Sequence, residues 1–198
     1  CNLCKKKFMS LLVVGTVAFD AIETPFGKTD KITGGSGNYI CQSAGHFTND
    51  MQLVSVIGDD FDQNELSYLK SIGTDIDGVQ VKEGEKSFFW SGKYHMDLNR
   101  RDTLVTDLNV LAAFDPILPE KYKTAEFLIL GNIDPTLQAK VISQMTERPK
   151  LIAMDTMNFW MDIALEPLKS VLKMVDLLIV NEEEARQLTN EYSLVKAA

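Results

Sequence analysis

The sequence predicts an α/β fold in which a parallel sheet is flanked by helices. Short apolar runs recur along the chain, as expected for strands buried on both faces, at residues 11–15, 127–131, 151–155 and 177–180. Most are followed by segments whose apolar residues repeat at helical spacing. Such alternation implies right-handed βαβ units and a parallel sheet, which binds ligands beyond the carboxyl ends of its strands.

Composition limits the class of protein. The chain has 198 residues, of which 45% are hydrophobic and 24% charged, enough to bury the core of one large domain. Its net charge of −8 argues against a nucleic-acid-binding surface, which needs clustered Lys and Arg. No segment has the roughly 18 consecutive apolar residues that a membrane span requires. We therefore expect neither a nucleic-acid partner nor a membrane partner.

The N-terminal residues carry a cysteine pair and a short basic run. Cys1 and Cys4 form a C-x-x-C, but no second ligand pair follows at zinc spacing, so we predict no metal site there. Three cysteines without a disulfide framework indicate a reducing compartment, and we expect a cytoplasmic protein. The lysines at 5–7 and the apolar residues after them imitate a signal peptide. The preferred interpretation is a buried strand, with residues 1–8 as an N-terminal extension before Met9.

The first part of the chain predicts strands, a hairpin and two helices. After the strand at 11–15 we expect a short, partly exposed hairpin at 21–33, a helix at 36–47 and a strand at 52–58. The pair Asp59-Asp60 is expected to begin a second helix, and Gly73 to end it as its C-cap.

Residues 79–106 have a different character. Val79 and Val81 alternate with polar residues, and an aromatic run at 88–90 follows, which predicts antiparallel strands. An aromatic hairpin is most often a packed sheet face, and it also suits a lid over a site. After Pro119 the regular alternation predicts strands at 127–131, 151–155 and 177–180 and helices around 137–145, 163–172 and from residue 182.

A glycine-rich loop and a carboxylate form the first candidate site. Gly34, Gly35 and Asn38 lie between an extended segment and a helix, and Asp20 precedes them on the first predicted strand. Glycines let the backbone approach a ligand, and carboxylate and amide groups hydrogen-bond hydroxyls, so the group indicates a polyol pocket. The alternatives are a turn-capping Asp and a flexible loop before a helix. The spacing matches neither a dinucleotide fingerprint nor a Walker A loop.

A second set of candidates follows the last two predicted strands. Asn181 and Glu184 have the spacing of a capping box, which needs no ligand. The same spacing also places an amide and a carboxylate near a phosphate and the water around Mg²⁺. Asp155 and Asn158 follow the strand at 151–155 and are candidates for positioning a substrate or a phosphate, with an Asx-turn as the alternative.

The order of these motifs resembles the PfkB family of carbohydrate kinases, also called the ribokinase-like family. The resemblance covers residues 9–198 and rests on the blocks L-L-V-V-G-T-V-A-F-D, G-G-S-G-N, L-V-S-V-I-G-D-D-F, D-T-M-N-F-W and V-N-E-E-E-A-R-Q-L-T. It implies a single three-layer α/β domain with a small β-sheet lid, built from residues near 21–33 and 86–106.

The resemblance also assigns roles to individual residues. It matches Asp20, Gly34, Gly35 and Asn38 to the family's sugar-binding residues, and Asn181 and Glu184 to its N-x-x-E motif near Mg²⁺ and the phosphates. No G-A-G-D segment, whose Asp is the family's general base, occurs among these 198 residues. We therefore assign no catalytic residue, and we expect that this C-terminal part of the fold is missing and that phosphoryl transfer is impaired.

The function implied by the resemblance is ATP-dependent phosphorylation of a sugar hydroxyl, with ATP and Mg²⁺ as cofactors. A nucleoside kinase of the same fold is the alternative, because Phe88, Phe89 or Trp90 could stack on a base. A third interpretation is a non-catalytic sugar-binding or assembly module. The exposed edges of a lid sheet also favour a homodimer through the lid.

Overall fold

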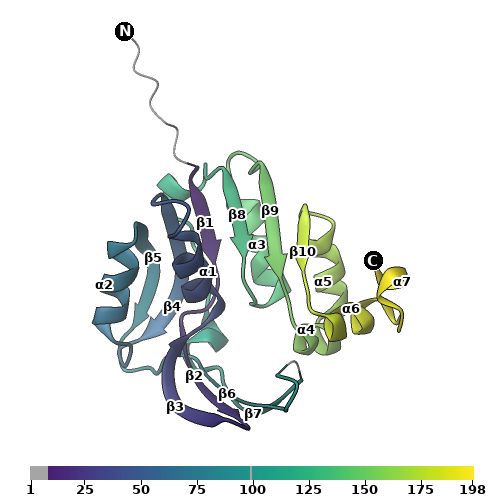
Figure 1. Cartoon of the computed structure of the whole chain (residues 1–198). Coiled ribbons are helices and arrows are strands. Elements are labelled where there is room, and N and C mark those ends of the chain that lie inside the picture. Colours follow the sequence, from purple (N-terminus) through teal and green to yellow (C-terminus); the bar gives the residue numbers. More distant parts are fainter. Residues whose placement is uncertain (1–8, 99) are drawn as a thin grey trace.

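The computed structural model describes residues 9–98 and 100–198, which form two sheets and their covering helices (Figure 1). The C-x-x-C of Cys1 and Cys4 and the other features predicted for residues 1–8 lie outside the described residues. In the part of the chain that is described, no helix is both long and apolar enough to cross a bilayer.

The larger sheet has six strands, and every neighbouring pair is parallel, as the sequence predicts. Near its centre, Leu12, Val13 and Val14 are completely buried. The short apolar runs are therefore strands covered on both faces. In spatial order the strands are β10 (Leu177–Ile179), β9 (Leu151–Asp155), β8 (Phe127–Leu130), β1 (Leu11–Val14), β4 (Met51–Gly58) and β5 (Thr74–Lys82).

Helices cover both faces of this sheet and complete three layers. Side chains of β1 alternate between two apolar cores: Val13 belongs to one, and Leu12 and Val14 to the other. The first core is covered by α1 (Ser36–Ala44) and α2 (Gln63–Ser71), the second by α3 (Pro135–Gln144) and α5 (Leu165–Leu172). The remaining helical elements are α4 (Asn158–Ile163), α6 (Glu182–Thr189), α7 (Leu194–Ala197) and the 3₁₀ turns η1 (Asn109–Ala113) and η2 (Glu120–Tyr122).

A separate small mixed sheet projects from the carboxyl end of the larger one (Figure 1). Its strands, in spatial order, are β3 (Gly27–Gly34), β2 (Ala18–Thr24), β6 (Phe89–Tyr94) and β7 (Arg101–Asp107). The hairpins β2–β3 and β6–β7 are antiparallel, and β2 pairs with β6 in parallel. This sheet contains the two segments predicted for a lid. Whether it acts as a lid stays a prediction.

Two strand assignments differ from the sequence prediction. Val79 and Val81 lie on β5 at the edge of the larger sheet, not in an antiparallel hairpin. Their alternation with polar residues reflects the position of β5 at the edge of the sheet. Gly78, next to Val79, has no side chain and so lets the Tyr122 ring pack closely against the strand. Asp20 lies on β2 instead of the first strand, because β1 ends at Val14 and the chain then leaves the larger sheet.

The start of the second helix also differs. α2 begins at Gln63, with Asp62 as its N-cap accepting a hydrogen bond from the Asn64 N–H at 2.8 Å. The predicted start, Asp59-Asp60, instead binds the segment that leads into the small sheet. Asp59 Oδ2 accepts from the Gly84 N–H at 2.8 Å, and Asp60 Oδ1 accepts from the Ser87 N–H at 2.7 Å.

Candidate functional site

The candidate site lies where the strand order of the larger sheet reverses. From β1, the chain places β4 on one side and β8 on the other, so the connections from β1 and β8 cover opposite faces. Ligands bind at such switch points in open α/β sheets. Gly15 and Gly131 follow these two strands, and a Cβ at either would lie 2.7 or 2.5 Å from Ser36 Oγ. The glycines therefore let the N-terminus of α1 approach both strand ends.

Asp20, Gly34 and Gly35 come together at this end of the sheet. Asp20 pairs with Ile32 across the β2–β3 hairpin, and its carboxylate lies against Gly34, where any Cβ would clash with Oδ2. The Gly35 N–H hydrogen-bonds the same carboxylate. Burial raises the pKa of Asp20, and this hydrogen bond partly offsets the rise. Gly35 has φ of +94° and is the N-cap of α1, a conformation that favours glycine.

Asn38 lies in the first turn of α1 and is only 2% exposed. Its Oδ1 accepts a hydrogen bond from Gln42 Nε2 at 3.0 Å. Among the described residues no acceptor pairs with Asn38 Nδ2, although the atom is buried. A buried donor without a partner is costly, so Asn38 remains a candidate for ligand binding. Its described side-chain partner is Gln42, on the next turn of the same helix, rather than Asp20.

Tyr39 is a neighbour of Asp20 for which the sequence predicts no role. Its side chain is about half exposed, at 48%, and its hydroxyl donates to the Thr33 carbonyl at 3.4 Å. Burial raises the pKa of Tyr39, and the charges of Asp20 and Tyr94 raise it further, which places all three in one electrostatic neighbourhood. The only sequence signal for Tyr39 is its position next to Asn38 in the first helical turn.

Asp155 ends β9 at the same edge of the sheet. Burial and then the charge of Glu184 raise its pKa to about 6, while Arg101 on β7 acts in the opposite direction. The backbone carbonyls of Asp155 and Gly131 both accept hydrogen bonds from Gln138 Nε2 at 3.0 Å. Gln138 is fully buried and ties the ends of β8 and β9 together. Gln138 was not among the predicted site residues. The sequence signal for it is a polar side chain within an amphipathic helix.

Asn181 and Glu184 form a complete capping box at the start of α6. Asn181 Oδ1 accepts from the Glu184 N–H at 3.0 Å, and Glu184 Oε2 accepts from the Asn181 N–H at 2.9 Å. The capping interpretation is thus confirmed, and a role toward phosphate stays a prediction. Asn158, the remaining candidate, donates from Nδ2 to Gln187 Oε1 at 2.5 Å and so ties α4 to α6.

The residues at this edge suit a cation that keeps most of its water ligands better than one bound entirely by protein side chains. Among the described residues no three His, Cys, Asp or Glu side chains cluster as a metal site. Mg²⁺ commonly keeps several waters and uses one or two carboxylates together with substrate phosphates. The mutual repulsion of Asp155 and Glu184, seen in the raised pKa of Asp155, is an environment that favours positive charge.

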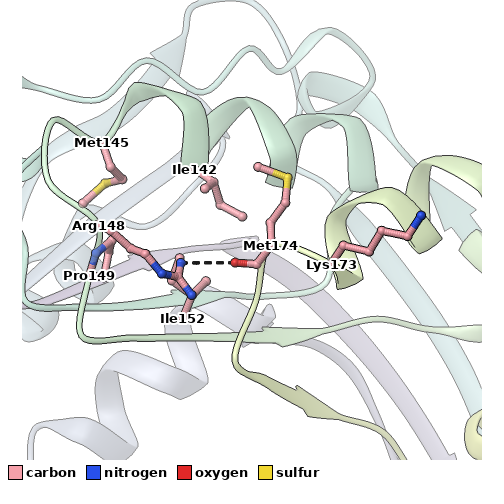
Figure 2. Close-up of a pocket in the computed structure, with 7 residues that line it drawn as sticks. All are labelled: Ile142, Met145, Arg148, Pro149, Ile152, Lys173 and Met174. Atoms are coloured by element: carbon pink, nitrogen blue, oxygen red, sulfur yellow. Dashed lines mark hydrogen bonds between the residues drawn. The ribbon is translucent and has the colours of Figure 1, made fainter.

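A hollow of about 470 Å³ lies elsewhere, at the opposite end of β9 (Figure 2). Ile142, Ile152 and Met174 line its apolar part, and Arg148 Nη1 crosses it to donate to the Met174 carbonyl at 3.2 Å. The site candidates are at the carboxyl ends of the strands, whereas this hollow is at the amino end of β9. Since ligands of parallel sheets bind at the carboxyl ends, the hollow is not the candidate site.

Comparison with known proteins identifies the family. The model of the pfkB family carbohydrate kinases matches residues 10–197. The chain belongs to the PfkB family. PfkB-family kinases are ATP-dependent phosphotransferases, so the predicted family is confirmed, whereas a sugar as the phosphorylated substrate stays a prediction.

A curated relative and solved structures agree with this assignment. A cytidine kinase of Thermococcus kodakarensis is 27% identical over 194 residues, which are 96% of this chain and 68% of that protein. The nucleoside kinase of Methanocaldococcus jannaschii superposes with a TM-score of 0.70 at 18% identity, covering 96% of this chain and 67% of the other. The ribokinase of Cryptococcus neoformans var. grubii, in complex with ADP, superposes with a TM-score of 0.74 at 19% identity. The match covers 92% of this chain and 60% of that one. These structures share the fold, and the chain spans about two thirds of the length of such relatives.

Proposed function

We propose that this PfkB-family chain binds the sugar moiety of a small molecule for ATP-dependent phosphorylation of one of its hydroxyls. The observation that carries the proposal is the Asp20 carboxylate, which lies against Gly34 and accepts from the Gly35 N–H at the start of α1. A carboxylate held there has further lone pairs for two neighbouring hydroxyl groups. Its partial burial strengthens such hydrogen bonds, because water competes less for them.

The amide of Asn38 is proposed as the second group that holds the sugar. Gln42 donates to Asn38 Oδ1 and therefore fixes the amide with its NH₂ group free. An acceptor on the substrate, such as a hydroxyl or ring oxygen, would satisfy that donor. Asp20 as acceptor and Asn38 as donor would together select a molecule that carries both hydrogen-bonding functions.

ATP and Mg²⁺ are proposed to bind near Asn181 and Glu184. Phosphate is favoured at the N-terminus of α6, and Glu184 with Asp155 provides negative charge for a hydrated cation beside it. Bound Mg²⁺ would neutralise charge on the phosphates of ATP. The protein groups then position the two substrates, since phosphoryl transfer depends mainly on positioning and electrostatic stabilisation.

A nucleoside is the second candidate for the phosphorylated substrate. The 27% identical relative is a cytidine kinase, and two structures of the same fold are nucleoside kinases. Tyr39 and Tyr94 near Asp20 would supply aromatic surface for a base beside a bound ribose.

The test is phosphoryl transfer from ATP, in Mg²⁺ buffer, to a panel of free pentoses, hexoses and nucleosides. We expect slow transfer to at least one of them, because the G-A-G-D segment is absent from these 198 residues. Asp20→Asn should lose substrate affinity by at least tenfold. Asp30→Asn, an exposed carboxylate on the same hairpin, is the matched control and should change nothing. Transfer to no member of either class would contradict the proposed function.

A further inference from the structure

The turn that follows β4 holds the chain where it enters the second hairpin of the small sheet. Asp60 Oδ1 accepts a hydrogen bond from the Ser87 N–H at 2.7 Å, and Ser87 Oγ accepts one from the Gly58 N–H at 3.0 Å. A Cβ at Gly58 would lie 2.2 Å from the Glu85 carbonyl oxygen, so the two segments touch through their backbones. Ser87 is only 1% exposed, and its N–H therefore depends on Asp60 for a partner.

The same turn also contacts the first hairpin. Asp60 Oδ2 lies 3.7 Å from Lys31 Nζ on β3, and Lys31 Nζ lies 3.8 Å from the centroid of the Phe19 ring on β2. That ring packs against Phe61, with centroids 5.1 Å apart. Burial alone would raise the pKa of Asp60, but the hydrogen bonds from Ser87 and the charge of Lys31 hold it below its usual value. The ionised carboxylate thus joins both hairpins to the end of β4.

Asp60 lies on the face of the small sheet opposite to the Asp20 carboxylate. Phe19 and Asp20 are successive residues of β2, so their side chains point to opposite faces. Asp60 and Lys31 are on the side of the Phe19 ring. The Phe19 N–H also donates to the Phe88 carbonyl at 2.9 Å, which links β2 to the segment that Asp60 holds. Any effect of Asp60 on a molecule bound at Asp20 must therefore pass through the sheet.

We infer that Asp60 is a positioning residue, which fixes the small sheet on the end of β4 and so holds the Asp20 carboxylate at the start of α1. This inference rests on the proposed function and deepens it. Without Asp60 the small sheet is free to shift, and only the fraction of molecules with Asp20 in place binds substrate. The apparent dissociation constant is the intrinsic one divided by that fraction, so a fall to about one tenth weakens binding about tenfold.

Calorimetric titration of the purified chain with ribose, cytidine and adenosine as probes tests the effect on binding. Asp60→Ala should weaken the preferred probe about tenfold. Asp60→Asn keeps an oxygen that accepts from the Ser87 N–H and loses only an exposed ion pair, so its affinity should stay within about threefold of wild type. Asp30→Ala, which removes an exposed carboxylate close to Lys31 on β3, is the matched control and should change nothing.

Hydrogen exchange of the Gly35 N–H, followed by NMR, tests the positioning without any ligand. This N–H donates to the Asp20 carboxylate, so its protection reports whether the carboxylate is in place. It should exchange at least about tenfold faster in Asp60→Ala and at nearly the wild-type rate in Asp60→Asn and Asp30→Ala. Amides of β8 in the larger sheet serve as the internal reference and should keep their wild-type rates in every variant.

The inference is overturned if Asp60→Ala leaves either the Gly35 exchange or the probe affinity at the wild-type value. Equal losses in Asp60→Asn and Asp60→Ala would also overturn it, because the hydrogen bond to Ser87 would then have no part in the effect. Faster exchange throughout β8 in Asp60→Ala would make Asp60 a general stabilising residue instead. If the wild type binds no probe and phosphorylates none, the proposed function fails, and the Gly35 exchange still decides whether Asp60 positions Asp20.

Discussion

The carboxylate of Asp20 lies directly over the Cα of Gly34, in the space that a side chain at position 34 would fill. Asp20 and Gly34 belong to the two strands of one hairpin, and the next residue, Gly35, begins helix α1. The hairpin therefore carries the carboxylate to the helix N-terminus, where the Gly35 N–H partly offsets the cost of burying it. Both residues are needed for this arrangement, since one supplies the charge and the other supplies the space.

Gly34→Ala should reduce substrate affinity as much as Asp20→Asn, by at least tenfold. The added methyl group occupies the position of Asp20 Oδ2 and forces the carboxylate away from the Gly35 N–H. Calorimetric titration with the best substrate measures the effect, and Gly27→Ala at the start of the same strand β3 is the control. Unchanged affinity in Gly34→Ala would show that the carboxylate is not where the substrate binds.

The stability of the protein should depend on the ionisation of Asp155. Its folded-state pKa of about 6 lies above the ordinary value of 3.8, because burial and Glu184 disfavour the charged form. The folded state thus holds this proton more tightly than the unfolded state, and the free energy of unfolding falls as pH rises from about 4 to 6. Asp155→Asn should remove this slope and stabilise the protein at pH 7.5.

Urea unfolding in chelator-containing buffer at several pH values between 4 and 8 measures this effect. The exposed Asp30 provides the control, since Asp30→Asn should leave the slope of the wild type in place. A wild-type contribution that instead rises with pH over this interval, or an unchanged slope in Asp155→Asn, would contradict the assignment.

Replacements at Asn181 should separate capping from ligand binding. Asn181→Ala removes the N-cap of α6 and should cost about 1 kcal/mol of unfolding free energy. Asn181→Ser keeps a good capping oxygen but removes the amide, so stability should stay within about 0.5 kcal/mol of wild type. If Asn181 also acts near phosphate, Asn181→Ser should weaken MgATP binding several-fold. Equal MgATP affinity in Asn181→Ser and wild type would leave only the capping role.

Gln138→Leu should destabilise the protein by about 2–4 kcal/mol. The substitution removes the donor that serves both the Gly131 and the Asp155 carbonyls, and buried acceptors without partners are costly. Chemical denaturation measures the loss, and Gln63→Leu on the exposed side of α2 is the control, expected within about 0.5 kcal/mol. A loss below about 1 kcal/mol for Gln138→Leu would mean that these strand ends do not depend on the bridge.

The small sheet should mediate a homodimer. Strand β7 is exposed along its whole length and presents Leu104 and Val105 at 53% and 40% exposure on the edge of the sheet. Open edges with apolar side chains favour pairing with another copy. Light scattering over a concentration series should show a dimer that Val105→Lys weakens. A concentration-independent monomer for the wild-type chain would refute this prediction.

The sequence predicted the larger sheet well because its strands are buried on both faces. A short continuous apolar run such as Leu12 to Val14 is typical of a strand buried on both faces. Apolar residues at helical spacing follow most of these runs and complete the βαβ pattern. The prediction failed at β5, whose edge position gives it the alternating pattern of an antiparallel strand. It also failed at Asp59 and Asp60, since a hydrogen bond to a residue far along the chain leaves no local signal.

What the sequence alone determined was therefore the layered α/β architecture, the family blocks and the capping box of Asn181 and Glu184, all of which depend on neighbouring residues. Only the tertiary structure decided that Asp20 meets Gly34, that Tyr39 lies near them, and that Trp90 folds over Gly92. These relationships arise from strand register and from the absence of a Cβ, and both become visible only when separate segments pack together.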